Sequence, residues 1–326
     1  MYNQSSSIGR YYRFSKYLRN RFGVRVYKVS IDAGFSCPNR DGSKSKDGCI
    51  YCDNRGFSFN SRIAAPLPIE KQIAKGIEFG KRRFKAEKFI VYFQAYTNTY
   101  APLDVLRKKY DVIRKFKNVV GISIGTRPDC INEEILDLIE SYTSDYEVWI
   151  EYGLQSIHDK TLEFINRGHV YKDFLEAVNL TKKRKNIKIC VHVIIGLPYE
   201  TEGDILETAE VLGRLELDGV KIHPIHVIKG TKLEEIYKKR QYRPLELDAY
   251  VDLAVGFLER IWSETVIQRI TADCPRELLI APMWIVDKKK VLGKIEEKLL
   301  QTNTFQGRLY KGRISYEHKA RYIERD

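Results

Sequence analysis

Segments with the pattern of a strand alternate with segments with the pattern of a helix, and this order constrains the fold most. Strands are predicted at residues 24–32, 88–94, 119–126, 147–154, 187–195 and 219–228. Helices are predicted at residues 69–84, 103–116, 132–142, 174–184 and 205–215. Strands that alternate with helices pair in parallel through right-handed crossovers. The sequence therefore predicts an α/β protein, either an open barrel or a doubly wound sheet, with ligands at the carboxyl ends of its strands.

The region beyond residue 240 has a weaker pattern. A helix at residues 247–262, a short strand at 266–271 and a Lys-rich helix at 286–300 are predicted there. We expect a core at residues 1–240 and an accessory C-terminal α/β extension at residues 241–326. Segments 11–25 and 308–325 are basic and aromatic, and such segments either stack on bases or pack on a core. Packing on the core is favoured for the N-terminal segment.

A loop rich in Gly, Pro, Asn and Asp follows the first strand and contains Cys37, Cys49 and Cys52. Residues of these types favour turns, so the loop is expected to form no helix or strand of its own. A CxxC pair with one more cysteine is a typical ligand set for a metal or an iron–sulfur cluster. A closed structural site needs four ligands, and no His or further Cys lies nearby in the sequence. Three ligands leave one metal position open for chemistry.

The remaining composition predicts a cytoplasmic protein that needs no membrane partner. No run of eighteen apolar residues is present, and the first ten residues lack the apolar region of a signal peptide. Only two residues separate Cys49 from Cys52, so metal binding explains the cysteines better than disulfides do.

The cysteine loop resembles that of the radical S-adenosylmethionine (SAM) enzymes, because its spacing is Cys-x11-Cys-x2-Cys with an aromatic residue before the last cysteine. This spacing is wider than the common Cx3Cx2C form. It is similar to that of the Elongator catalytic subunit and, more closely, to that of the YhcC-like proteins. The sequences Thr-Arg-Pro-Asp at 126–129 and Asn-Arg-Gly-His at 166–169 extend the resemblance. The resemblance implies a partial (β/α)6 TIM-like barrel of the radical SAM type.

The resemblance also implies the cofactors. Cys37, Cys49 and Cys52 would hold a [4Fe–4S] cluster, Tyr51 would contact the cofactors, and SAM would bind the open iron through its amine and carboxylate. The reduced cluster would cleave SAM to methionine and a 5′-deoxyadenosyl radical, which abstracts a hydrogen atom from the substrate. An electron donor such as flavodoxin or ferredoxin is implied as a partner.

Residues that follow the second and fourth strands are expected to contact SAM. Gln94, Tyr96 and Thr97 stand where many relatives carry Gly-Gly-Glu and hold the methionine part of SAM. Gln155 and Arg167 have the spacing of the family's ligands for the ribose and the carboxylate. Each of these residues also has an alternative role that involves no ligand. The segment with Gln94, Tyr96 and Thr97 would be a polar loop that caps the next helix, Gln155 a helix cap, and Arg167 a member of a surface ion pair.

The fifth strand is expected to flank the adenine. Ile194 would supply an apolar face, and Gly196 would permit close approach of the backbone. Some relatives carry Asp in place of His192. In this sequence, His192 is expected either to hydrogen-bond to SAM or to be a core histidine. On the sixth strand, Lys221 and His223 share a face, where they point to the substrate or fill the barrel mouth.

The substrate is predicted from charge and from the resemblance. A net charge of +13 favours a nucleic-acid partner, although lysines spread over helix surfaces explain it equally well. The Elongator-like motifs favour tRNA, modified on the side chain of the wobble uridine. One alternative is a radical SAM enzyme that acts on a small molecule or a peptide. Another is a non-enzymatic RNA-binding module with a structural zinc, which would contain no iron.

Overall fold

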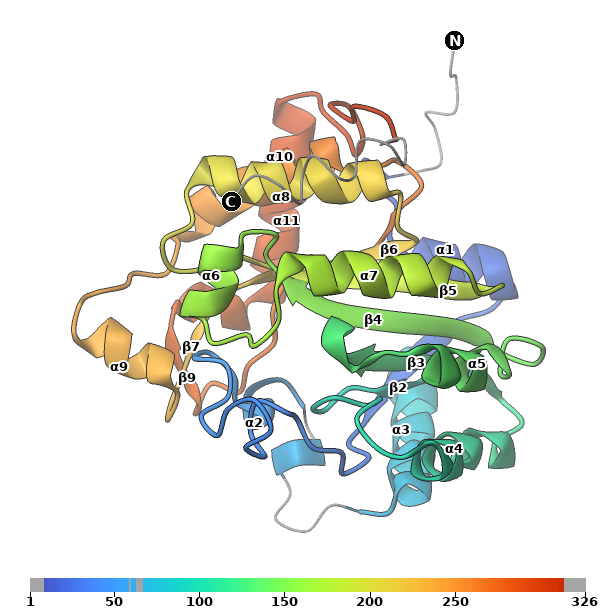
Figure 1. Ribbon diagram of the computed structural model, residues 1–326. Helices are drawn as coiled ribbons and strands as arrows, with labels where there is room; N and C mark the ends of the chain where they lie inside the picture. The colour runs from blue at the N-terminus through green and yellow to red at the C-terminus, as the bar shows by residue number, and fades with distance from the viewer. Residues whose placement is uncertain (1–8, 59, 63–66, 314–326) are drawn as a thin grey trace.

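A computed structural model describes residues 9–58, 60–62 and 67–313, and a curled sheet of seven parallel strands forms its centre (Figure 1). The strand order is β1-β2-β3-β4-β5-β6-β8. The strands are β1 (Val26–Ile31), β2 (Lys88–Phe93), β3 (Val119–Thr126), β4 (Glu147–Gln155), β5 (Ile187–Ile195), β6 (Gly219–Pro224) and β8 (Val266–Arg269). The sheet curls into a partial barrel. The predicted fold class is thus confirmed, and the sheet has one strand more than the six of the prediction.

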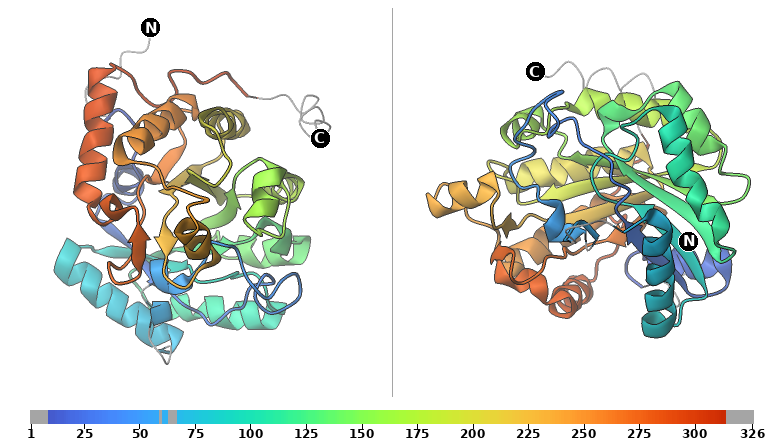
Figure 2. Two further views of the ribbon diagram at one scale, coloured as in Figure 1. Left: turned by 90° about the vertical axis from the view of Figure 1, so that its left-hand side faces the viewer. Right: turned by 90° about the horizontal axis from the view of Figure 1, so that it is seen from below.

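Helices cover the outer face of the sheet, as the two further views show (Figure 2). The main ones are α3 (Ile69–Phe84), α4 (Leu103–Tyr110), α5 (Glu133–Glu140), α7 (Tyr171–Lys182), α8 (Glu202–Leu215), α10 (Leu247–Arg260) and α11 (Lys288–Gln301). Each of the first five lies in a connection between successive strands, which accounts for the parallel pairing. No helix of the described residues is long and apolar enough to cross a membrane.

Alternation along each strand separates the core from the lumen of the barrel. In β2, Phe89, Val91 and Phe93 face the helices and belong to the main apolar core, whereas Tyr92 lines the lumen. Successive side chains of a strand point to opposite faces of the sheet. In a β/α barrel of this kind, the side chains that face the helices form an apolar layer, and those that face the lumen can differ from them in polarity. The interior is therefore free to carry polar residues.

The amino-terminal end of the lumen is closed by aromatic side chains of helix α1 (Phe14–Phe22). The rings of Phe14 and Tyr17 lie edge-on to Trp149, with centroids 5.9 and 5.6 Å away. Trp149 is fully buried. The N–H of Ile267 in β8 donates to the carbonyl of Tyr12 at 2.8 Å, which fixes the start of this segment against the edge strand. The prediction that the basic, aromatic N-terminal segment packs on the core is confirmed.

The structure corrects the sixth predicted strand. β6 ends at Pro224, which has no amide hydrogen to continue a ladder. The chain then forms β7 (Val227–Ile228), which pairs antiparallel with β9 (Leu279–Ala281) in a separate two-stranded sheet. Helices α6 (Asp159–Phe164) and α9 (Lys232–Lys238) were not predicted from the sequence.

The region beyond residue 240 joins the barrel through β8. This strand fulfils the prediction of a short strand at 266–271 and pairs in parallel with β6. The sheet therefore draws strands from both sides of the predicted division. Most of the basic tail predicted at 308–325 lies outside the described residues.

Candidate functional site

The lumen of the barrel contains a cavity of about 1500 Å³, and its wall includes the loops at the carboxyl ends of the strands as well as residues of α1 and α3. Eleven of the twelve residues that the sequence singled out as cofactor ligands line it. They are Cys37, Cys49, Tyr51 and Cys52 in the cysteine loop, Gln94, Tyr96 and Thr97 after β2, Gln155 at the end of β4, Arg167 between α6 and α7, and His192 and Ile194 on β5. Residues from distant parts of the sequence thus meet in one place.

Gly196 is the twelfth residue and does not line the cavity. Its backbone φ is +87°, a conformation that glycine adopts without strain. A Cβ at this position would lie 2.9 Å from Cδ1 of Leu245. The carbonyl of Gly196 accepts a hydrogen bond from the hydroxyl of Tyr242 at 2.7 Å. The close approach that Gly196 permits is therefore to Leu245.

The Asn-Arg-Gly-His segment clamps the cysteine loop. The buried Asn39 donates from Nδ2 to the carbonyls of Asn166 and Arg167, at 2.6 and 2.9 Å. In return, Asn166 donates from Nδ2 to the carbonyl of Gly48 at 2.7 Å. Gly168 has a φ of +69°, and a Cβ there would collide with Oδ1 of Asn39. The sequence analysis missed this clamp, although the Asn and Gly of the motif were visible beside Arg167.

The three thiols of the loop form a donor set that fits a metal cluster. None of Cys37, Cys49 and Cys52 is in a disulfide. Burial and, after it, the nearby charge of Cys49 raise the pKa of Cys52 to about 12, although Arg40 acts in the opposite direction. Several thiolates crowded together are stable only when a metal neutralises them, so such a group couples proton release to metal binding. The cradle is consistent with a cluster and three protein ligands.

Arg167 lies beside the cysteines and is not in a surface ion pair. Its Nε and Nη2 donate to the carbonyl of Gly153 at 3.1 and 2.6 Å, and its Nη1 donates to Sγ of Cys49 at 3.6 Å. Only 7% of the residue is exposed. Burial lowers the pKa of this guanidinium, but the charges of Cys49 and Tyr51 outweigh burial and hold the pKa above its usual value. A buried cation next to a thiol stabilises negative charge on that sulfur.

The residues that end β2 and β4 have unusual backbones. Tyr96 and Gln155 have φ values of +62° and +84°, which non-glycine residues adopt only at a cost in free energy. The strain at Gln155 coincides with a shift in the register between β4 and β5, which turns its side chain. Near them, the buried hydroxyl of Thr97 has no hydrogen-bond partner within the described part of the chain. Strain and an unused polar group together are typical of a ligand site.

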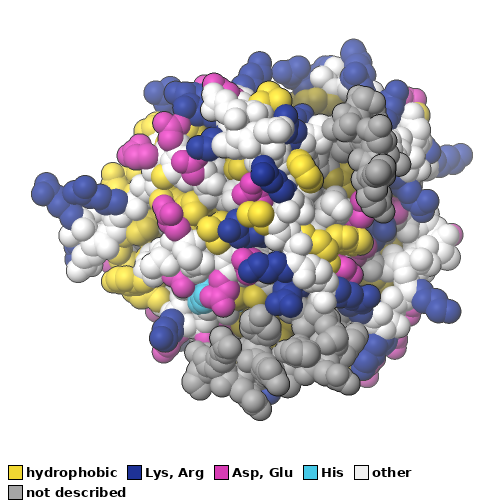
Figure 3. Space-filling view, turned by 90° about the horizontal axis from the view of Figure 1, so that it is seen from above, with side chains coloured by type: hydrophobic (Ala, Val, Ile, Leu, Met, Phe, Trp, Pro, Cys, Tyr) yellow, Lys and Arg dark blue, Asp and Glu magenta, His cyan; other side chains and the backbone are white. Residues whose placement is uncertain are grey.

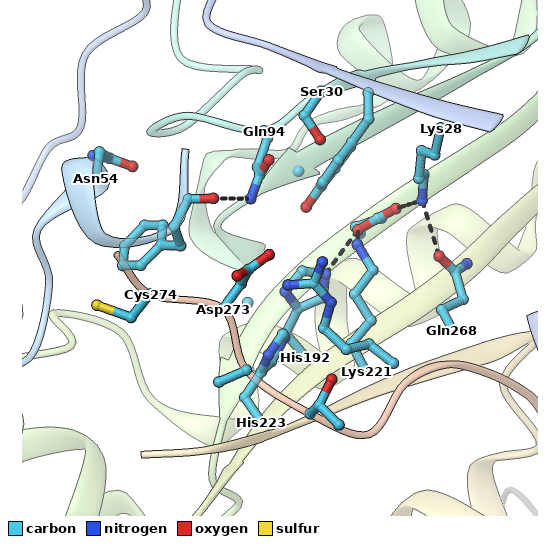
Figure 4. A pocket seen from close by; sticks show the side chains of 18 of the residues that line it. Lys28, Ser30, Asn54, Gln94, His192, Lys221, His223, Gln268, Asp273 and Cys274 are labelled. Carbon is cyan, nitrogen blue, oxygen red and sulfur yellow. Dashed lines mark hydrogen bonds and ion pairs between the residues drawn. The ribbon is translucent and has the colours of Figure 1, made fainter. Parts of the chain in front are cut away.

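Deeper in the lumen, the buried carboxylate of Glu151 accepts hydrogen bonds from Lys28, Lys221 and Ser123. Figure 4 labels Lys28 and Lys221 of this group, together with His192. Nε2 of His192 lies 2.8 Å from Oε2 of the Glu151 carboxylate. Burial raises the pKa of Glu151, but the two lysines outweigh burial and hold it well below its usual value. The sequence analysis missed Glu151, although an acidic residue in the middle of the apolar strand β4 was a signal for it.

Two family models match the chain. The Radical SAM superfamily matches residues 37–212, and the Radical_SAM C-terminal domain matches residues 217–301. An uncharacterized protein of Methanocaldococcus jannaschii is 40% identical over 90% of this chain and 91% of its own length. The protein YhcC of Escherichia coli is 36% identical over 89% of this chain and 92% of its own length.

More distant relatives match over less of their own length or at lower identity. The tRNA uridine(34) acetyltransferase of M. jannaschii is 30% identical over 56% of this chain and 33% of its own length. The structure of an archaeal Elp3 from Methanocaldococcus infernus superimposes with a TM-score of 0.66 at 18% identity, over 86% of this chain and 64% of that one. Membership of the family implies an iron–sulfur cluster and SAM as cofactors. By its fold, its cysteine-lined cavity and these matches, the chain belongs to the radical SAM superfamily of enzymes.

Proposed function

We propose that Cys37, Cys49 and Cys52 hold a [4Fe–4S] cluster at the mouth of the barrel and that the enzyme modifies the side chain of the wobble uridine in tRNA. The observation that carries the cofactor assignment is the meeting of three free thiols with the buried guanidinium of Arg167 in one cavity. When bound, the cluster and SAM supply a 5′-deoxyadenosyl radical that removes a hydrogen atom from an unactivated carbon.

The chain's own residues bind and orient the cofactor. The clamp formed by Asn39 and Asn166 holds the cysteine loop in place before a cluster binds. The unpartnered hydroxyl of Thr97 is available to the amine or carboxylate of SAM, and the amide of Gln155 to its ribose. Ile194 offers an apolar surface to the adenine. The walls of the lumen limit the access of water to the reacting groups.

The assignment of tRNA rests on the relatives more than on charge. One relative is named as a tRNA uridine(34) acetyltransferase, and position 34 is the wobble position. The net charge of +13 is compatible with RNA. On the face that Figure 3 shows, however, Lys and Arg stand among Asp and Glu. Ion pairs such as Lys294–Asp248 and Lys298–Asp252 also neutralise part of the positive charge. Charge alone therefore supports tRNA only in a general way.

The cofactor proposal is tested by iron content and SAM cleavage. The full chain is reconstituted without oxygen, and 5′-deoxyadenosine is measured after addition of SAM with dithionite, or with flavodoxin or ferredoxin as the proposed donor. We expect iron and 5′-deoxyadenosine from the wild type and from Cys274→Ala, which removes a buried thiol outside the loop. Cys52→Ala is expected to lose both. A colourless wild type that contains zinc would contradict the proposal.

The substrate proposal is tested on total tRNA. Modified nucleosides are compared between cells with and without the protein, and the purified enzyme is then supplied with the tRNA of the deficient cells. We expect one wobble-uridine derivative to disappear and to be restored by the enzyme, but not by Cys52→Ala. An unchanged set of nucleosides, together with intact SAM cleavage, would refute the tRNA assignment and favour a small-molecule or peptide substrate.

A further inference from the structure

Five of the charged or titratable side chains in the lumen form a group between the mouth and the aromatic floor, beside Tyr92 and His223. They are Lys28 from β1, Glu151 from β4, His192 from β5, Lys221 from β6 and Arg269 from β8, and we call them the charged layer. All five line the same cavity as the cysteines. Figure 4 shows Lys28, His192 and Lys221 pointing into this part of the cavity. Apart from His192, which the sequence analysis offered as a ligand of SAM, the cofactor proposal does not use this layer.

The charges of Lys28, Lys221 and Glu151 do not balance. Both ammonium groups bind the one carboxylate, and the side chain of Glu151 is fully buried. Burial lowers the pKa of His192 to about 4, and Lys221 acts in the same direction, so this imidazole is neutral at pH 7. One positive charge therefore remains in excess.

Arg269 adds a second unbalanced charge. Its Cα is paired with that of Lys221 across β6 and β8. Within the described ranges, no residue forms a hydrogen bond or an ion pair with its guanidinium. Asp273 is the other carboxylate of the cavity wall, and it binds Lys288 at 2.5 Å. Arg269 is thus the cation of the layer that is most available to a ligand.

The excess charge at the buried Lys221 is costly unless a counter-ion is bound. The excess here is positive, so the expected counter-ion is an anion. Glu151, Cys190 and His192 lie close enough together to suggest a metal site. The carboxylate, however, already binds two ammonium groups, which would repel a metal cation.

We propose that Arg269 and Lys221 bind an anionic group of the substrate, a carboxylate or a phosphate, inside the barrel. Glu151 holds Lys221 in position. On the proposed function, which this inference extends, the wobble-uridine side chain that enters the barrel ends in such a group. Gln155 stands four positions after Glu151 on β4, which corresponds to about 13 Å. A substrate anchored at the charged layer therefore reaches toward the mouth, where the radical forms.

Binding of small anions tests the layer without reference to tRNA. The melting temperature of the reconstituted full chain is followed while chloride is replaced by acetate or by inorganic phosphate at constant ionic strength. We expect a saturable increase with at least one of the two anions, and the effective anion identifies carboxylate or phosphate. The increase is expected to be lost in Arg269→Gln and retained in Lys294→Gln, which removes the same charge from an exposed pair on α11. An increase retained in Arg269→Gln, or absent from the wild type, would overturn the proposal.

Turnover provides a second and separate measurement. With tRNA from deficient cells, Arg269→Gln is expected to raise KM about tenfold or more, because a charged hydrogen bond is lost. Arg269→Lys should restore part of it, and formation of 5′-deoxyadenosine without substrate should stay at the wild-type rate. An unchanged KM would contradict the inference. If tRNA is no substrate at all, the proposed function fails. The anion titration then still shows whether the charged layer binds an anion.

Discussion

The two ends of the barrel lumen differ in every property that matters for function. At the floor, Phe14 and Tyr17 pack edge-on against the fully buried Trp149. At the mouth, thiols, a strained Gln155 and the unpartnered hydroxyl of Thr97 face a cavity. The floor is packed for stability, although the indole N–H of Trp149 has no hydrogen-bond partner within the described part of the chain. The mouth also carries backbone strain at Gln155, which lowers stability.

One strand contributes to both regions. Along β4, Trp149 lies at the floor, Glu151 in the charged layer, Gly153 beside Arg167 and Gln155 at the mouth. Successive positions on one face of a strand are about 7 Å apart. Stability and chemistry are thus separated by distance within a single element, which predicts that substitutions at the two ends have opposite effects.

The largest effect on stability is expected at the floor. Trp149→Ala should lower the free energy of unfolding by about 3–5 kcal/mol, because it leaves a cavity between α1 and the sheet. Tyr199→Ala, which truncates a side chain that is 76% exposed, should change it little. Urea denaturation of both variants measures the difference. Similar losses for the two variants would show that the floor has no special role.

The next effect concerns the clamp at the mouth. Gly168→Ala is expected to displace Asn39 and to reduce the iron bound after reconstitution by half or more. Gly23→Ala is the matched control, because Gly23 has a φ of +73° and no atoms near its missing Cβ. Both variants carry the same backbone strain, so iron content separates strain from loss of the clamp. Full iron content in Gly168→Ala would contradict the clamp.

Acid should destabilise the charged layer. The folded-state pKa of His192 is lowered to about 4 by burial and by Lys221, whereas an unfolded histidine titrates near 6.5. Below pH 6.5 the unfolded chain therefore binds a proton that the folded chain rejects, and stability falls until about pH 4. We expect His192→Gln to lose about 1–2 kcal/mol less than the wild type between pH 7 and pH 5. Equal losses for the two proteins in urea titrations would show that the pKa of His192 does not differ between the folded and the unfolded state.

The smallest effect is expected from relief of backbone strain at the mouth. Gln155→Gly should leave stability unchanged or raise it by up to about 1 kcal/mol, because glycine adopts a φ of +84° freely. The same variant should cleave SAM at least tenfold more slowly. Asn186→Gly, at a φ of +61° away from the cavity, should preserve cleavage. Normal cleavage by Gln155→Gly would remove Gln155 from the set of proposed SAM ligands.

Features that depend on local pattern were predicted well from the sequence. The strands and helices follow periodicity, and the residues at strand ends gather because parallel strands share an edge. This is why Cys37, Gln94, Gln155 and Arg167 meet in one cavity, although their roles as ligands stay predictions. The end of β6 was placed wrongly because the apolar residues after Pro224 continue the strand pattern in another sheet.

Features that depend on long-range partners were not predicted. The hydrogen bond between Asn39 and Asn166 joins residues 127 positions apart, and nothing in the sequence around either residue identifies the other as its partner. Glu151, Lys28 and Lys221 come from three strands and meet only when the sheet curls. Their charges become unusual through burial, which a sequence pattern does not reveal. Gly196 satisfied a motif, but its close neighbour is Leu245.

The contact between Lys28 and Gln268 has a consequence for how such enzymes diverge. Nζ of Lys28 donates to Oε1 of Gln268 at 2.9 Å, and this links β1 to β8, the two edge strands that do not pair with each other. Elsewhere in the wall, main-chain ladders set the spacing whatever the side chains are. At this seam two replaceable side chains, together with α1, which contacts both edge strands, take the place of a ladder. We expect substitutions of Lys28 and Gln268 to change the width of the chamber without changing the fold.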